Sequence, residues 1–239
     1  MNYLFATKIK LFLQDRHMCV NYTPTRKEAL ADFGVNGQQL DDYKAETWQD
    51  YAAPIIRHDN HGEREVMLAS YGMIPKDKMP IGAKRYSTMN ARAETIGQLR
   101  TYAKPWREGM LCLVPMQHFF EPCYESGKAE RWKIGLKDEA DFAVAGIYQE
   151  WDEIEGAKIS YSFTQITINA NDHPLMKRFH KPEDEKRSLV IIHRRHYDDW
   201  LSCKNTEFAR SFFHCYPASE MQAEAVKANQ HVERQSSLF

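Results

Sequence analysis

The sequence predicts an α+β fold, in which a curved, barrel-like and mostly antiparallel sheet with flanking helices forms a single domain. Two observations support this prediction. The apolar segments are mostly short and rich in β-branched and aromatic residues, which is typical of strands. They do not alternate regularly with long helices, as the strands of a parallel α/β sheet would. A chain of 239 residues with no internal repeat and no Ser/Gly-rich linker also fits one continuous domain.

The predicted strands follow one another along most of the chain. They are the short apolar segments 66–71, 111–114, 119–124, 132–136, 142–148, 161–168 and 188–192. The turn sequence Ser126-Gly127-Lys128 predicts a hairpin between 119–124 and 132–136. The last segment, with the sequence SLVII, is continuously apolar, so we expect it to be a buried strand.

The predicted helices are few and short. Thr25 and Glu28 form a capping-box pattern, an apolar stripe follows, and Gly34 is a typical stop signal. Together these features predict a helix over 25–33. The other predicted helices occupy about 93–103, 196–202 and 205–213.

Composition and charge exclude several classes of protein. Hydrophobic residues make up 43% of the chain and charged residues 27%, which excludes a wholly disordered or low-complexity protein. No apolar run approaches the roughly 18 residues that a transmembrane helix needs. The 32 Lys and Arg residues balance the 33 Asp and Glu residues, so the chain as a whole is not a basic nucleic-acid coat.

Positive charge is nevertheless concentrated in two stretches. Residues 76–107 contain eight Lys or Arg and two Asp or Glu, and residues 174–196 contain seven and three. Tyr71, Tyr86 and Trp106 lie in or beside the first stretch. Basic residues interleaved with aromatic ones are the components of a groove for single-stranded nucleic acid. Charge alone, however, fits an ordinary solvated surface better.

The cysteines are an odd number, widely spaced and without a CxxC pair. They are Cys19, Cys112, Cys123, Cys203 and Cys215. A disulfide framework and a zinc site of standard spacing therefore have no support, and a reducing cytoplasm fits best. The first seventeen residues are a poor signal peptide, because lysines interrupt their apolar run.

Four segments depend on particular residue types rather than on a hydrophobic pattern. In chain order they are Met18-Cys19; Asn90-Ala91-Arg92-Ala93-Glu94-Thr95; Cys112-Leu113-Val114-Pro115 with a following Glu121; and Thr167-Ile168-Asn169-Ala170-Asn171 with a following His180. Each segment alone is a weak signal. In this order and at these separations they resemble the SOS response-associated peptidase (SRAP) family of abasic-site processing proteins. The resemblance covers nearly the whole chain from Met18.

The resemblance implies a covalent chemistry for Cys19. Such proteins bind single-stranded DNA and cap an abasic site, whose sugar can open to an aldehyde. The amine of an N-terminal cysteine condenses with the aldehyde to an imine, and the thiol of the same cysteine then adds to form a thiazolidine ring. Peptidase-like self-processing that exposes the cysteine is also implied, so we expect peptidase (hydrolase) activity, lyase activity or both.

The resemblance also implies roles for three further catalytic residues. Glu121 is the expected general acid or base. His180 is expected to protonate the sugar oxygen while the ring opens, since histidine titrates near working pH. Asn90 is expected to hold the amine of Cys19 or the sugar through paired hydrogen bonds. Taken singly, each of these residues also has an ordinary structural interpretation.

DNA contacts are expected from a second group of residues. Arg92 follows Asn90 by two positions, so in an extended segment both side chains point to the same side, where Arg92 can bind a flanking phosphate. Tyr71 is expected to stack on a base. Lys84 and Arg85, in the first basic stretch, are expected to contact the DNA backbone.

The chain departs from the family pattern near its N-terminus. Many members read Met-Cys-Gly-Arg, whereas Val20 and Asn21 follow Cys19 here, so the phosphate contact of that arginine is absent or moved. Many members also have tryptophan where Tyr71 stands. Residues 1–17 have no counterpart in the family and leave the amine of Cys19 inside a peptide bond.

We therefore expect residues 1–17 to be absent from the mature protein. Either translation begins at Met18, which we favour, or the chain cuts itself between Met18 and Cys19. The predicted domain spans 18–229, and residues 230–239 form a C-terminal tail. Within the domain, the composition of 219–230 favours a helix while the resemblance favours a final strand, and we adopt the strand.

Two other functions remain open from the residues alone. One is a cysteine hydrolase or peptidase that uses Cys19, His180 and Glu121 on other substrates. The other is a non-catalytic nucleic-acid-binding module. In each case we expect no metal or organic cofactor, no membrane association and a monomer. The expected location is the cytoplasm, with association to the nucleoid when the protein is engaged on DNA.

Overall fold

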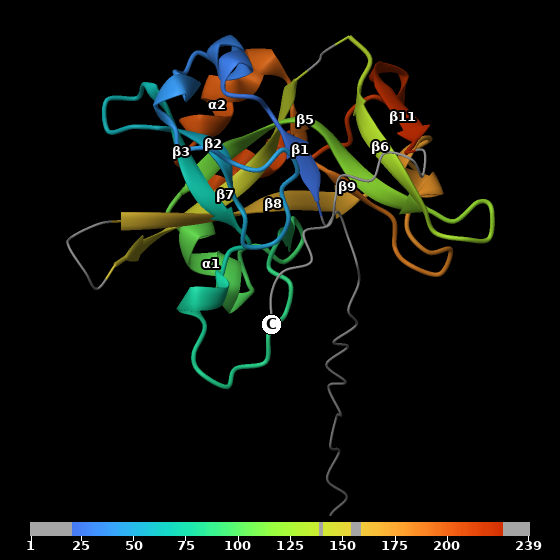
Figure 1. Cartoon of the computed structure of the whole chain (residues 1–239), viewed down its shortest axis with the longest axis horizontal. Coiled ribbons are helices and arrows are strands. Elements are labelled where there is room, and N and C mark those ends of the chain that lie inside the picture. The colour runs from blue at the N-terminus through green and yellow to red at the C-terminus, as the bar shows by residue number, and fades with distance from the viewer. Residues whose placement is uncertain (1–20, 139–140, 154–158, 227–239) are drawn as a thin grey trace, which may run out of the picture.

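The computed structural model describes residues 21–138, 141–153 and 159–226, and its centre is a closed barrel of five strands (Figure 1). The barrel strands are β2 (Ala52–His58), β3 (Arg64–Tyr71), β5 (Leu111–Cys123), β7 (Phe142–Asp152) and β8 (Ile159–Asn169). Neighbouring strands are antiparallel except β3 and β8, which are parallel. The predicted fold, an α+β domain around a mostly antiparallel barrel-like sheet, is confirmed.

Six further strands of the described residues extend the barrel. They are β1 (Tyr22–Pro24), β4 (Asn90–Arg92), β6 (Glu130–Leu136), β9 (Arg187–Leu189), β10 (Ile191–Ile192) and β11 (Met221–Ala225). The long strand β5 pairs with β7 through its first half and with β6 through its second half, so β6 and then β11 continue the sheet away from the barrel (Figure 1). The short strands β4 and β9 pair with β8.

The helices of the described residues are all short. The α-helices are α1 (Arg100–Arg107), α2 (Tyr197–Leu201) and α3 (Thr206–Ala209), and the 3₁₀ helices are η1 (Glu28–Phe33), η2 (Gly37–Gln39), η3 (Lys76–Lys78), η4 (Met176–Arg178), η5 (Arg194–His196), η6 (Arg210–Phe212) and η7 (Ala218–Glu220). Within the described ranges, none of these helices has the length and apolar character needed to cross a membrane.

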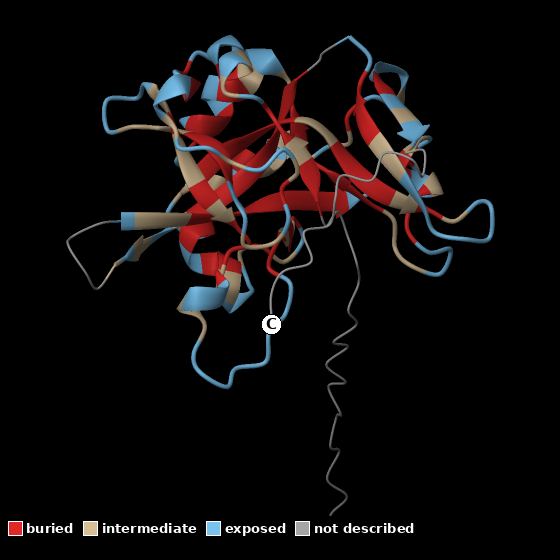
Figure 2. Ribbon diagram, in the orientation of Figure 1, coloured by how far each residue is buried: buried red, intermediate tan, exposed pale blue. Residues whose placement is uncertain are grey.

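The core has two parts, and the buried residues that form them are concentrated on the barrel strands (Figure 2). Successive side chains of a strand point to opposite faces. On β5, Cys112 and Val114 accordingly pack in one cluster, while Leu113 packs in the other together with Phe33 and Trp200 from the helices. The short helices therefore cover an outer face of the barrel.

Most of the predicted strands are confirmed, with two corrections. Segments 111–114 and 119–124 are not separate strands but parts of β5. The predicted SLVII strand is interrupted at Val190, because the chain there changes partner from β8 to β7. The hairpin turn at Gly127 and the final strand, found as β11, are confirmed.

The predicted helices need more correction. The helix expected over 25–33 is the 3₁₀ helix η1, and the hydroxyl of Thr25 donates to Asp141 Oδ1 (2.7 Å) instead of capping it. Gly34 ends the helix with φ +77°, as predicted. The helix expected over 93–103 begins only at Arg100, because Ala93 still continues the pairing of β4 through a hydrogen bond to Thr167 O (2.9 Å).

The remaining two helix predictions are close to the structure. The segment 196–202 contains α2, which follows η5 directly. The segment 205–213 divides into α3 and η6. The predicted boundaries of the domain at 18 and 229 stay a prediction, since both lie outside the described residues.

Candidate functional site

Glu121 lies in the second half of β5, opposite Trp132 of β6, and its side chain is completely buried. Removing a carboxylate from water is costly unless other groups stabilise it. A buried carboxylate at the end of a long strand is therefore a candidate for a functional group rather than a stabilising one.

His180 provides a partner for this carboxylate. It follows η4, and its backbone N–H donates to Pro122 O (2.9 Å), which ties it to β5 one residue from Glu121. His180 Nδ1 lies 3.4 Å from Glu121 Oε2, and the histidine side chain is also buried. The backbone of His180 has φ +64°, a left-handed conformation that non-glycine residues seldom adopt and that is enriched at functional sites.

The second ring nitrogen of His180 has a partner that defines the protonation of the ring. Nε2 lies 3.4 Å from the backbone oxygen of Arg187, and a carbonyl oxygen can only accept a hydrogen bond. Nε2 therefore carries a hydrogen, and Nδ1 faces Glu121 with at most one proton between the two groups. Both contacts are long, as is common for catalytic hydrogen bonds before substrate binds. The pair is arranged to take up or release one proton.

Arg187, which the sequence analysis did not identify, connects the segment that contains Glu94 to the segment that contains Thr167 and His180. Its side chain is buried and makes two parallel hydrogen bonds to Glu94 (2.8 and 2.9 Å), with a third to Thr167 O (2.7 Å). Its backbone oxygen faces His180. A charged residue directly before the SLVII segment was the available signal, since a buried arginine needs dedicated acceptors.

Arg92 and Asn90 lie on the short strand β4, as expected for an extended segment. The two side chains are partly exposed on one side, while Ala91 between them is buried on the other. Arg92 Nη2 donates to Glu185 Oε2 (2.6 Å). The backbone oxygen of Asn90 accepts a hydrogen bond from the hydroxyl of Tyr102 (3.1 Å).

Glu185 connects Arg92 to Arg187 and so to His180. Its Oε1 accepts hydrogen bonds from Asn169 Nδ2 (2.8 Å) and Arg187 Nη1 (3.0 Å). Burial alone would raise the pKa of Glu185. The hydrogen bonds from Asn169 and Arg92, with the charges of both arginines, outweigh that effect and lower the pKa to about 2. The carboxylate is thus ionised.

The structure corrects the prediction that Tyr71 stacks on a DNA base. The ring is completely buried in the barrel, where it stacks on Phe163 (5.1 Å between centroids) and meets the edge of Tyr22 (5.4 Å). Its hydroxyl donates to Gln165 Oε1 (3.0 Å). Both the ring and the hydroxyl of Tyr71 therefore contribute to the core.

Lys84 and Arg85 lie in the exposed loop between η3 and β4. Arg85 forms an ion pair with Asp50, so this arginine is not an isolated surface charge. Nothing in the loop connects these two residues to Glu121 or His180. Their predicted contact with DNA stays a prediction.

Cys19 itself lies outside the described residues, which begin at Asn21. The backbone oxygen of Asn21 accepts from the N–H of Phe120 (3.2 Å), the residue that precedes Glu121. The buried side chain of Asn21 donates to Glu46, which also pairs with Arg131 (2.6 Å).

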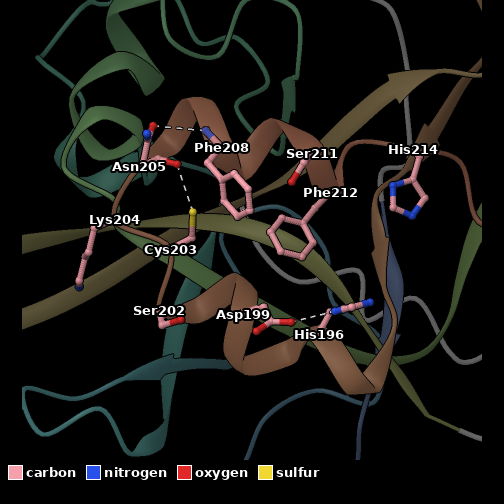
Figure 3. A pocket seen from close by; sticks show the side chains of 10 residues that line it. All are labelled: His196, Asp199, Ser202, Cys203, Lys204, Asn205, Phe208, Ser211, Phe212 and His214. Atoms are coloured by element: carbon pink, nitrogen blue, oxygen red, sulfur yellow. Dashed lines mark hydrogen bonds and ion pairs between the residues drawn. The ribbon is translucent and has the colours of Figure 1, made fainter.

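A hollow lies away from Glu121 and His180, around α2, α3 and η6 (Figure 3). It contains a cysteine and histidines, but their contacts give no reactive arrangement. Cys203 Sγ donates to Asn205 O (3.1 Å), and burial raises the pKa of its thiol. His196 pairs with Asp199 (2.8 Å) and not with the cysteine. A thiolate nucleophile is therefore not prepared there.

Comparison with known proteins identifies the family. A family model described as SOS response associated peptidase (SRAP) matches residues 18–233. The chain belongs to this family. The match includes Glu121, His180 and the segments that carry Asn90 and Arg187.

Within the described ranges, no group of three or more His, Cys, Asp or Glu side chains is arranged to hold a metal ion.

Several relatives of known name resemble the chain. It is 34% identical over 164 residues to the abasic site processing protein YoaM of Bacillus subtilis, and 33% identical over 164 residues to YobE of the same organism. The alignment with YoaM spans 66% of this chain and 66% of YoaM, slightly less than two thirds of that protein. The abasic site processing protein HMCES of Pongo abelii is 23% identical over 145 residues, which span 48% of this chain and 41% of HMCES.

Solved structures support the fold. A protein from Bordetella bronchiseptica superimposes with a TM-score of 0.77 and 31% identity, over 87% of this chain and all of that one. A protein from Bacteroides thetaiotaomicron gives a TM-score of 0.68 at 22% identity, over 88% of this chain and 93% of that one.

Proposed function

We propose that this protein processes abasic sites in single-stranded DNA by forming a covalent thiazolidine through Cys19. The observation that carries the proposal is the buried pair of Glu121 and His180. Phe120, the neighbour of Glu121, donates its backbone N–H to the oxygen of Asn21, which follows Cys19 by two residues. Membership of the family and relatives named abasic site processing proteins support it.

The proposed reaction has two steps. The unprotonated amine of Cys19 attacks the aldehyde carbon of the opened sugar, and the carbinolamine loses water to leave an imine. The thiol then adds across the carbon–nitrogen double bond, its sulfur binding the carbon while the nitrogen gains a proton. The product is a five-membered ring, and one water leaves in total. An α-amine has a pKa of about 7.7–8.0, so a usable fraction is unprotonated near neutral pH.

Glu121 and His180 fit the proton transfers of these steps. Opening of the sugar, loss of water and ring closure each move one proton. The carbonyl of Arg187 keeps a hydrogen on Nε2 of His180. The proton that is transferred in each step is therefore taken up or supplied between Nδ1 of His180 and the carboxylate of Glu121. Asn90 adds hydrogen bonds to the amine or the sugar without adding charge.

The mechanism requires a free amine on Cys19, and therefore removal of residues 1–18. We favour translation from Met18 followed by ordinary loss of that methionine. Self-cleavage between Met18 and Cys19, assisted by Glu121 and Asn90, is the alternative, and it would give the protein a peptidase activity. Arg92, Lys84 and Arg85 are the proposed contacts to DNA phosphates, and we propose that a monomer binds the strand.

A denaturing gel tests the function. Protein whose N-terminus is confirmed as Cys19 should form an adduct with a single-stranded oligonucleotide that contains one abasic site, and none with the intact oligonucleotide. Cys19→Ser should lose this stable adduct and retain at most an imine that borohydride reduction traps. Absence of an adduct from the confirmed protein would reject the function.

One other function has support from a specific observation. The Glu121–His180 pair is also the base-and-orienter arrangement of cysteine hydrolases. A hydrolase does not use the amine of its cysteine. Acetylation of the Cys19 amine should therefore abolish adduct formation with DNA under the first proposal and spare hydrolysis of an amide substrate under the second.

A further inference from the structure

Glu185 occupies an anion-binding position beside the candidate site. Among the described residues, Arg92 from β4, Asn169 from the end of β8 and Arg187 from β9 donate to its carboxylate. Parallel donation by guanidinium and amide groups is the arrangement that proteins use for phosphate as well as for carboxylate. The side chain of Arg92 is 32% exposed, so a ligand from solvent can reach it.

Glu185 belongs to a short acidic loop in a basic region. Between residues 174 and 196 the chain has seven Lys or Arg, and its three acidic residues, Glu183, Asp184 and Glu185, are consecutive. The loop begins at His180 and ends at Arg187, so two residues of the candidate site delimit it.

The base of this loop is firmly attached while its acidic part faces a hollow. The backbone N–H of Lys186 donates to Asn171 Oδ1 (2.8 Å), and its oxygen accepts from Ala170 N (2.8 Å). The acidic residues line a surface hollow of about 780 Å³ that also reaches His180. The Glu185 carboxylate can therefore leave its donors by a local movement, while the base of the loop stays in place.

We propose that Glu185 is an internal competitor for a DNA phosphate, held on Arg92 and Asn169 until a strand displaces it. The inference rests on the proposed function, since it assumes that Arg92 binds a phosphate. A phosphodiester carries the same single negative charge as the carboxylate, so the exchange leaves the charge at the donors unchanged. Arg187 keeps its two hydrogen bonds to Glu94 throughout.

Because a phosphate must displace Glu185, the protein binds a DNA strand more weakly and more selectively than it would if Arg92 were unoccupied. Part of the affinity for phosphate is used to release Glu185, so the apparent affinity falls in proportion to the fraction of protein in which Arg92 is available. A ligand that presents no phosphate at this position leaves the loop closed beside His180.

The test compares Glu185→Ala with Glu183→Ala, an exposed acidic neighbour in the same loop. We expect Glu185→Ala to bind an intact single-stranded oligothymidylate about tenfold more tightly than the unmodified protein, which is the size of one charge-assisted hydrogen bond. Glu183→Ala, which removes the same charge, should change affinity by no more than about twofold, because a solvated charge contributes little. Equal effects of the two variants would overturn the proposal.

A second comparison separates competition at Arg92 from a general loss of charge. In an Arg92→Ala background, Glu185→Ala should no longer raise the affinity, and a persistent gain would overturn the proposal. Melting curves are recorded for every variant, and Glu185→Gln replaces Glu185→Ala if the latter does not fold.

Adduct formation on the abasic oligonucleotide is measured separately. An adduct without a Glu185 effect rejects only the competitor, and a Glu185 effect without an adduct rejects only the covalent function.

Discussion

Two of the histidine–carboxylate pairs among the described residues, His196–Asp199 and His180–Glu121, have the same chemistry in opposite surroundings. His196 and Asp199 are 2.8 Å apart, with 40% and 62% of their side chains exposed. His180 and Glu121 are 3.4 Å apart, with 2% and 0% exposed. The shorter pair sits one helical turn apart in sequence beside an open hollow, where water screens the charges and the contact contributes little. Burial, not distance, distinguishes the pair for which we propose a function.

The two pairs also differ in how they are held. His180 is fixed through its backbone to Pro122, through Nε2 to Arg187 and through an uncommon backbone conformation. His196 instead accepts a hydrogen bond from its neighbour Arg195 (3.0 Å) at the surface. Several independent constraints on one side chain are what a site for proton transfer requires, since geometry determines its rate.

The largest expected effect is on the rate of adduct formation. Glu121→Gln and His180→Ala should each slow the reaction about 100-fold at saturating abasic DNA, because each removes one half of the proton-transfer pair. Asp199→Asn, the matched change in the exposed pair, should leave the rate unaltered. Quenched time courses on denaturing gels measure all three. Weaker binding with an unchanged rate at saturation would show that the proposed roles of Glu121 and His180 are wrong.

The next effect concerns the buried guanidinium behind His180. Glu94→Ala removes two charge-assisted hydrogen bonds from Arg187, and we expect it to lower the free energy of unfolding by about 2 kcal/mol. Glu207→Ala breaks an exposed pair with Arg210 and should cost no more than about 0.5 kcal/mol. Urea titrations give both values. Equal losses would mean that the network around Arg187 is no more important for stability than a surface pair.

A smaller effect is expected from Arg92 on the binding of intact DNA. Arg92→Ala removes one proposed phosphate contact, so the slope of log affinity against log salt concentration should become shallower by about one unit. Fluorescence anisotropy at several salt concentrations measures the slope. If the slope is the same in both proteins, Arg92 has a structural role through Glu185 only.

The smallest expected effect is on the pH dependence of stability, and it comes from His118, a partly buried histidine that belongs to neither pair. Burial, with the charges of Lys133 and Arg131, lowers the pKa of His118 to about 4 from a usual value of 6.5. Between these values the unfolded chain binds a proton that the folded protein does not, so stability falls as the pH falls from about 6.5 to about 4. His118→Gln should flatten the dependence of unfolding free energy on pH in that window. A slope as steep as that of the unmodified protein would assign the effect to other groups.

The sequence predicted the fold better than it predicted the site. Local patterns were sufficient for the barrel strands, since short segments rich in β-branched and aromatic residues can be recognised without knowing which strands they pair with. The very short strand β4 was not recognisable, because its extended form depends on pairing with β8. The capping box at Thr25 was misleading for a similar reason: Asp141, far along the chain, takes its hydroxyl.

The site residues show the same limit. Nothing local indicates that Glu121 and His180 meet, and their connection came from a resemblance between whole sets of motifs. Tyr71 was misjudged because an aromatic residue near basic residues is equally suited to a core or to a DNA surface, and only its burial decides. Arg187 and Glu185 were missed because charged residues near a buried strand are ordinarily read as surface residues.

The most direct test of the account is the intact mass of the protein–DNA adduct, with its N-terminus located by fragmentation. The account predicts a protein that begins at Cys19, joined to the abasic oligonucleotide with the loss of one water and with the linkage on that residue. An adduct on a protein that retains residues 1–17, or a linkage on a lysine, would contradict the thiazolidine mechanism.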